Sequence, residues 1–179
     1  MFLLWKALKW AVLVTVLLVA ALGATAWFFV WPSGDEPRRA HAVVVLDGGD
    51  GERLDRALDL MADKVAPVLV VYGGKGAGTA KASRLCEGDA VFEVICPVAR
   101  KDGPAEAKSL AGLAYRRSWH SLVVVTSTYD VTKARLLVDR CFDGKIAVVE
   151  SKPSLGKWVR AVPDEWAGYF TALVVERGC

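Results

Sequence analysis

The chain has 179 residues, of which 54% are hydrophobic and 24% are charged, and its formal net charge is +3. This length predicts one domain with at most a short appendage. The composition excludes a disordered chain and a collagen-like repeat, because both contain far fewer apolar residues. The net charge is too small to argue for binding to nucleic acid, so no such partner is expected.

An apolar segment near the start of the chain is long enough to span a membrane. It carries no charged side chain, and a helix of about 20 apolar residues crosses the hydrocarbon core. Lys6 and Lys9 precede it, which favours a cytoplasmic amino terminus. We therefore expect a cytoplasmic end at 1–9, a single anchor at 10–31 in contact with membrane lipid, a linker at 32–39 and an extracytoplasmic domain at 40–179.

The alternative for this segment is a cleaved secretory signal. Ala24-Thr25-Ala26 fits the small-x-small pattern of a cleavage site. However, the apolar run continues to Trp31, and the core of a signal is usually shorter, which favours an uncleaved anchor. Both interpretations place the rest of the chain outside the cytoplasm, in an oxidising space.

Strand and helix signals alternate along the rest of the chain. Uninterrupted apolar, β-branched runs are typical of strands buried on both faces, and such alternation is typical of a parallel sheet. The sequence therefore predicts an α/β, Rossmann-like, doubly wound fold with a mainly parallel five-stranded sheet. The predicted strands are 41–46, 67–72, 91–95, 121–125 and 145–149, and the predicted helices are 51–64, 79–86, 104–117, 131–141 and a tail helix from about residue 163.

Polar residues follow four of these strands, at the point where each strand ends. Ligands of doubly wound sheets bind beyond the carboxyl ends of the strands, so we expect these residues to share one rim. Glycine lets backbone amides approach a ligand, and arginine can hold a phosphate by two hydrogen bonds. Glycine turns and solvated charges are the structural alternative. The candidate ligand-binding residues are Gly48, Gly49, Arg53, Gly73, Gly74, Lys75, Ser127 and Lys133.

Carboxylates on the same rim complicate anion binding, because they repel a bare phosphate. Asp47, Glu106 and Asp130 are the candidate catalytic residues, and Glu106 is expected to orient a basic partner or to act as a general base. Metal-assisted hydrolysis of a phosphoester or diphosphate by Asp47, Asp50 and Asp130 is an alternative, and it requires their oxygens to converge. The spacing matches no metal motif, so no metal ligand is assigned and no cofactor is named.

The cysteines and histidines favour structural roles. His41 opens the first predicted strand and His120 precedes the fourth, so both belong to the edge opposite the rim, which disfavours a Ser-His-Asp triad. Cys86 and Cys96 flank the third predicted strand, so we expect a disulfide between them that closes a short loop. The four cysteines can form up to two disulfides, and three different full pairings are possible. They are Cys86, Cys96, Cys141 and Cys179.

The rim segments, taken in order, resemble the YdcF-like family from His41 to the tail helix. HAVVVLDGGDGERLDRALDL is similar to the opening strand, turn and helix of that family, and APVLVVYGG to its second strand. Glu106 with Ala107 and the stretch LVVVTSTYDVTKAR match two further segments. The chain departs from the family at Asp47, Gly103-Pro104, Asp130 and Lys133, where glycine, Asn-Thr, histidine and arginine are usual.

The resemblance implies maintenance of the bacterial envelope, with links to the peptidoglycan barrier and its polyprenyl carrier, but no established reaction. We therefore expect a protein of the bacterial cytoplasmic membrane that binds an anionic small molecule or a lipid-linked sugar phosphate. Whether it is an enzyme stays open. Besides the hydrolase, the alternative is a non-catalytic scaffold that contacts envelope partners through Trp158 and residues 151–162, with an exposed apolar patch.

Overall fold

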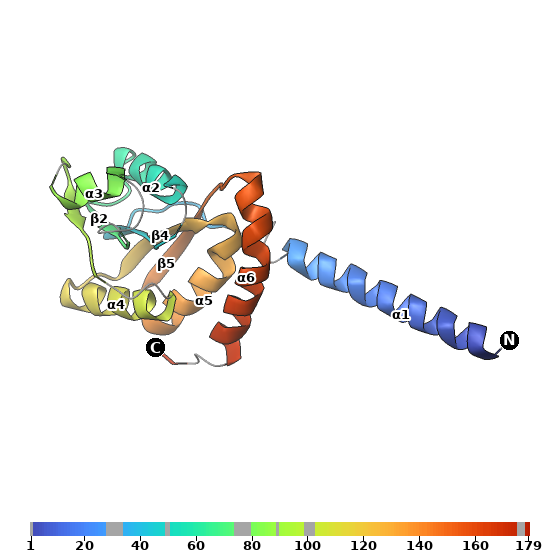
Figure 1. The fold of residues 1–179 in the computed structure, drawn as a ribbon. Coiled ribbons are helices and arrows are strands. Elements are labelled where there is room, and N and C mark those ends of the chain that lie inside the picture. The colour runs from blue at the N-terminus through green and yellow to red at the C-terminus, as the bar shows by residue number, and fades with distance from the viewer. Residues whose placement is uncertain are drawn as a thin grey trace.

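The computed structural model describes residues 2–27, 34–48, 51–73, 80–88, 90–98, 103–174 and 178–179. A long N-terminal helix precedes an alternation of strands and helices, as the apolar runs predict (Figure 1). The elements are α1 (Phe2–Thr25), β1 (Ala42–Val45), α2 (Glu52–Ala62), β2 (Val68–Val71), α3 (Ala80–Cys86), β3 (Glu93–Ile95), α4 (Gly103–Arg116), β4 (Ser121–Ser127), the 3₁₀ turn η2 (Thr128–Asp130), α5 (Val131–Cys141), β5 (Lys145–Ser151) and α6 (Leu155–Val174).

The five strands form one parallel sheet in the order β3-β2-β1-β4-β5. The chain runs outward from β1 to β3 and then returns to the other side of β1. This reversal places the switch point between β1 and β4, whose ends pair at Val45 and Val125. The predicted Rossmann-like, doubly wound α/β fold is therefore confirmed, and its switch point defines where a ligand site is expected.

Alternate residues of each strand pack on opposite faces of the sheet, because successive side chains of a strand point to opposite sides. Val43 and Val45 of β1 pack with α2 and α3, whereas Ala42 and Val44 pack with α4 and α5. Ala172 adds α6 to the second cluster. The strands β1 and β2 are apolar throughout because both of their faces are buried, which explains their uninterrupted runs of valine and leucine.

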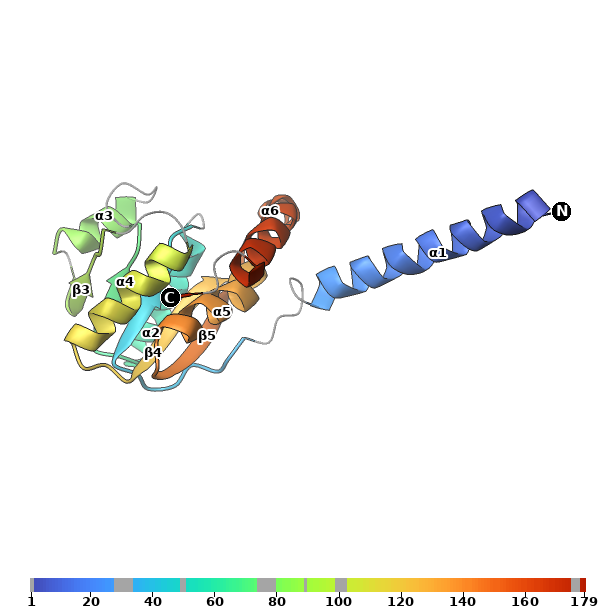
Figure 2. The same ribbon diagram turned by 90° about the horizontal axis from the view of Figure 1, so that it is seen from below.

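The helix α1 projects away from the α/β domain in both views (Figures 1 and 2). Its stretch from Trp5 to Thr25 is long and apolar enough to cross a membrane, a property that a signal sequence shares. The helix begins at Phe2 and so includes Lys6 and Lys9, which we expected to precede it. The last part of the predicted span, residues 28–31, lies outside the described residues.

The C-terminal helix differs from its prediction. It begins at Leu155, whereas we expected a loop over 151–162 and a helix start near residue 163. Pro163 favours the first turn of a helix, because it lacks a backbone N–H, and this preference moved the predicted start too far along the chain. The loop prediction is wrong: β5 extends to Ser151 and α6 covers most of the segment.

Two disulfides and one acidic side chain tie peripheral segments to the domain. Cys86 pairs with Cys96 across the short loop that we expected, and Cys141 pairs with Cys179. In the segment after α1, the Asp35 carboxylate accepts hydrogen bonds from Arg135 and from the N–H of Val148, both at 2.8 Å. Burial opposes ionisation, but these two hydrogen bonds hold the pKa of Asp35 below its usual value.

Candidate functional site

A cavity of about 370 Å³ lies beyond the carboxyl ends of β1 and β4. Its walls come from the turn after β1, the first turn of α4, η2 with α5, and the inner face of α6. It therefore occupies the switch point of the sheet, where the topology predicts a ligand site. The charged side chains that line it include Asp47, Arg53, Glu106, Asp130, Lys133 and Glu165.

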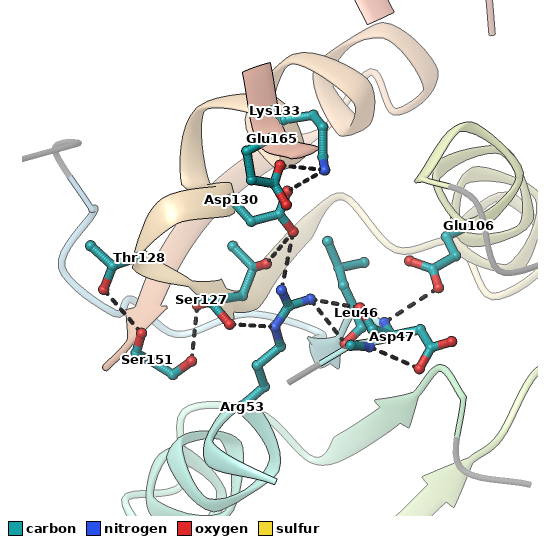
Figure 3. Close-up of polar contacts among 12 residues, drawn as sticks. Leu46, Asp47, Arg53, Glu106, Ser127, Thr128, Asp130, Lys133, Ser151 and Glu165 are labelled. Carbon is teal, nitrogen blue, oxygen red and sulfur yellow. Dashed lines mark hydrogen bonds and ion pairs between the residues drawn. The ribbon is translucent and has the colours of Figure 1, made fainter. Parts of the chain in front are cut away.

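Arg53 lies at the centre of the rim with a side chain that is 4% exposed (Figure 3). Its Nε donates to the Ser127 hydroxyl at 2.8 Å, and its Nη1 donates to the carbonyl oxygen of Asp47 at 2.6 Å. Its Nη2 donates to Oδ2 of Asp130 at 3.3 Å. Each of its nitrogens already has an acceptor in the protein. Arg53 therefore links the ends of β1 and β4, and its guanidinium group is not free to bind a ligand through two hydrogen bonds.

Asp130 is the shared counter-charge of the rim. Its Oδ2 also accepts a hydrogen bond from the buried hydroxyl of Thr126 at 2.8 Å, and its Oδ1 forms an ion pair with Nζ of Lys133 at 3.0 Å. Two basic side chains therefore converge on one carboxylate that is itself almost fully buried. A buried carboxylate stays charged only with such partners, so the group is best understood as one network.

Lys133 extends this network to α6. Its Nζ donates to Oε2 of Glu165 at 2.5 Å. Burial alone lowers the pKa of Lys133, but the carboxylates of Asp130 and Glu165 outweigh it and raise that pKa above its usual value. Burial and the charge of Asp130 raise the pKa of Glu165 to about 7, against the opposing effect of Lys133.

Glu106 lies on the opposite wall, in the first turn of α4, and is 6% exposed. Its Oε1 accepts a hydrogen bond from the backbone N–H of Asp47 at 3.3 Å. Burial and the negative charge of Asp47 raise the pKa of Glu106 to about 8. The carboxyl group therefore holds its proton at neutral pH, which suits a hydrogen-bond donor or a general acid in the cavity.

Gly48 lies in the turn after β1 and lines the cavity. It has a φ of 104°, a conformation that residues with side chains rarely adopt. A Cβ built at this position would lie 3.4 Å from Nη1 of Arg53. The absence of a side chain thus lets the backbone pass closely over the guanidinium group.

The remaining predicted residues lie around the cavity or beyond what the structure describes. The Ser127 hydroxyl accepts a hydrogen bond from Nε of Arg53 and donates one to Glu52 at 3.0 Å, so it helps to hold the guanidinium group in place. Gly73 lies two residues after the end of β2 and does not line the cavity. The other predicted residues, Gly49, Asp50, Gly74 and Lys75, lie outside the described residues, as does the side chain of Trp158.

Two groups of this site, Glu165 and Thr126, were not among the residues predicted from the sequence. Glu165 belongs to the predicted start of the tail helix, and only the earlier start of α6 places it inside the helix, facing Lys133. Thr126 had a visible signal, since it belongs to the polar segment that follows the fourth predicted strand. Nothing in the sequence indicates that its hydroxyl donates to Asp130.

The charges of the site favour some ligands over others. Arg53 and Lys133 are already neutralised by Asp130 and Glu165, so the lining has no surplus of positive charge. The start of α4 reaches the cavity at Gly103, and the start of α5 reaches it at Asp130, the residue before the helix, and at Lys133 in its first turn. Helix starts favour negative charge. Within the described ranges, no three His, Cys, Asp or Glu side chains are arranged to hold a metal ion.

Comparisons of the chain with protein families, curated proteins and solved structures found no match. The geometry and chemistry of the rim are therefore what indicate a function.

Proposed function

We propose that this chain is a membrane-anchored envelope protein of the YdcF-like kind, located in the bacterial cytoplasmic membrane. Its extracytoplasmic domain binds the sugar phosphate headgroup of a lipid-linked molecule, or a related anionic small molecule, at the rim. The observation that carries the proposal is the cavity at the switch point, where two helix starts, two basic groups and five carboxyl groups meet.

The mixture of charges supports a glycosyl phosphate better than a bare phosphate. Carboxyl groups such as Glu106 and Glu165 can exchange hydrogen bonds with the hydroxyl groups of a sugar. The first turns of α4 and α5 attract the phosphate, which Lys133 can approach from α5. Because Glu106 has a pKa of about 8, it is neutral at physiological pH and adds no repulsion.

Metal-assisted hydrolysis receives less support from the same geometry. It needs several carboxylates free to coordinate one ion. Asp130 is engaged by Arg53 and Lys133, and the carboxylate of Asp47 accepts a hydrogen bond from the N–H of Gly48 at 2.8 Å.

Thermal unfolding of the full chain in detergent tests the proposal. The probes are inorganic phosphate, a uridine-diphosphate amino sugar and a polyprenyl phosphate, each with and without Mg²⁺. Selective binding raises the free energy of unfolding by about 2.7 kcal/mol at a ligand concentration of 100 Kd. We expect the amino sugar and the polyprenyl phosphate, but not inorganic phosphate, to raise Tm.

Matched variants locate the binding. Glu106→Gln and Lys133→Met should weaken the rise in Tm, whereas Lys81→Met, which removes only an exposed ion pair with Asp55, should leave it unchanged. If none of the probes raises Tm in the unmodified chain, the proposed ligand class is wrong.

A further inference from the structure

The helix α6 has two faces of different character. On its inner face, Glu165 lines the cavity and Ala172 belongs to the core. On its outer face, Phe170 is 57% exposed and Val174 is 59% exposed, and Trp166 stacks on Phe170 with ring centroids 5.7 Å apart. An apolar face of this kind on a helix is the signature of a contact with a partner or with lipid.

The outer face of α6 lies beside the end of α1. The indole Nε1 of Trp166 donates to the hydroxyl of Thr25, in the last turn of α1, at 3.2 Å. Most of α1 is exposed, and its side chains become partly covered only at 24–26. The apolar face of α6 is therefore continuous with the end of the segment that crosses the membrane in the proposed arrangement.

The orientation of α6 agrees with this position. In Figure 1 α6 is the helix of the domain nearest to the end of α1, and it runs across the axis of α1 rather than along it. A helix that crosses the direction of a membrane-spanning helix at its end lies along the membrane surface. Tryptophan is enriched at that depth, because its ring is apolar and its N–H is polar.

The segment between α1 and the domain keeps the two close. Only nine residues separate Thr25 from Asp35, and the carboxylate of Asp35 is held by Arg135 and Val148. A chain of this length spans at most roughly 35 Å even when fully extended. The domain therefore cannot move far from the lipid surface.

From these observations we infer that α6 lies on the surface of the membrane that α1 spans, with Phe170 and Val174 in contact with lipid. The inference rests on the proposed function in one respect, namely that α1 is a membrane anchor. It goes further, because Glu165 lies roughly 140° around the helix from Phe170. One helix thus contacts lipid on one side and the cavity on the other, which places the cavity within reach of a lipid-linked headgroup.

Spin labels on the full chain in phospholipid nanodiscs test this inference. A nitroxide is attached to a single introduced cysteine in Phe170→Cys or Val174→Cys, since the described cysteines are all in disulfides. Collision with oxygen, which concentrates in lipid, is compared with collision with a water-soluble nickel chelate. We expect both labels to favour oxygen severalfold over the label in Tyr115→Cys, a residue of α4 that is 87% exposed.

A label in the middle of α1, in Leu17→Cys, separates failure of the inference from failure of the anchor. If this label also meets the nickel chelate freely, α1 is not in the membrane and the proposed function loses its anchor. If Leu17→Cys is in lipid but Phe170→Cys and Val174→Cys match Tyr115→Cys, the inference is wrong. Labels on α6 that are shielded from both reagents also overturn it, because a second protein surface then covers the helix.

Discussion

Asp130 shows how much of this site depends on a single side chain. It is the partner of Arg53, Thr126 and Lys133 at once, and its own side chain is 10% exposed. Removing one member of a buried ionic network leaves the others charged and without a partner, which costs more than the network contributes as a whole. The rim is therefore held in place by the same groups that are candidates for binding.

Asp130→Asn should destabilise the full chain strongly. Loss of the carboxylate leaves the guanidinium group of Arg53 buried without its counter-charge, and removing one partner of a buried pair costs about 3–5 kcal/mol. Asp55→Asn is the matched control, because Asp55 pairs with Lys81 where both side chains are more than half exposed. That change should cost less than about 1 kcal/mol. Urea unfolding in detergent micelles measures both, and equal losses would contradict the buried network.

Glu106 should make stability depend on pH. Its pKa is about 8 in the folded chain and near 4.5 in the unfolded chain. The folded state then holds one more proton, so this contribution is fully present below pH 4.5 and is lost as the pH rises toward 8. In Glu106→Gln, Tm should fall less between about pH 5 and pH 8 than in the unmodified chain.

A matched control belongs to this titration as well. Glu93→Gln alters a carboxylate in an exposed ion pair with Arg117 and should leave the pH dependence of Tm intact. Part of the dependence should persist in Glu106→Gln, because the raised pKa of Glu165 acts in the same direction. Identical pH profiles for Glu106→Gln and the unmodified chain would show that Glu106 is already ionised in the fold.

At the scale of elements, the strands could be predicted well and the last helix could not. Runs such as AVVVL are apolar on both faces, a pattern that is typical of strands covered on both sides. The start of α6 depends on a proline that local preference places at a helix start but that this fold accommodates inside the helix.

The rim was predictable in outline and not in its pairings. Parallel strands bring their carboxyl ends to one edge, so the meeting of Arg53 with Ser127 follows from topology. The contact between Arg53 and Asp130 joins residues 77 positions apart, and the contact between Lys133 and Glu165 joins residues 32 positions apart. Such long-range contacts depend on how helices pack, which hydrophobic periodicity does not specify.

The disulfide between Cys141 and Cys179 should hold α6 against α5. It spans a sequence separation of 38 residues and encloses the whole of α6, whereas Cys86–Cys96 spans 10 residues and joins the end of α3 to the residue after β3. A closed loop of the longer size restricts the unfolded chain by about 4 kcal/mol. In the double variant Cys141→Ser/Cys179→Ser, hydrogen exchange should accelerate in α6 and stay unchanged in β1 and β4.

The other disulfide provides the matched comparison. In Cys86→Ser/Cys96→Ser, exchange should accelerate in α3 and β3, with α6 protected as before. An α6 that exchanges equally slowly in all three proteins would mean that its packing on α5 holds it without the covalent link.

At the scale of the whole molecule, the anchor, the tether and the disulfides agree on one environment. A helix that can cross a membrane precedes a domain in which all described cysteines are paired. Structural disulfides persist in oxidising spaces and are rare in the cytosol, where thiols are kept reduced. The domain should therefore acquire its disulfides only if α1 delivers it across the membrane.

This dependence can be measured in intact cells without purifying the protein. Cells are quenched with acid, and thiols are then labelled with a maleimide-linked polymer under denaturing conditions, so that each free cysteine adds a mass step on a gel. The full chain should show no step, whereas a chain that lacks residues 2–25 should show four, because it stays where thiols are reduced. Reduction before labelling should convert the first pattern into the second. Four steps from the full chain would place the domain on the cytoplasmic side, and a membrane-facing α6 would then contact the inner leaflet instead of the outer one.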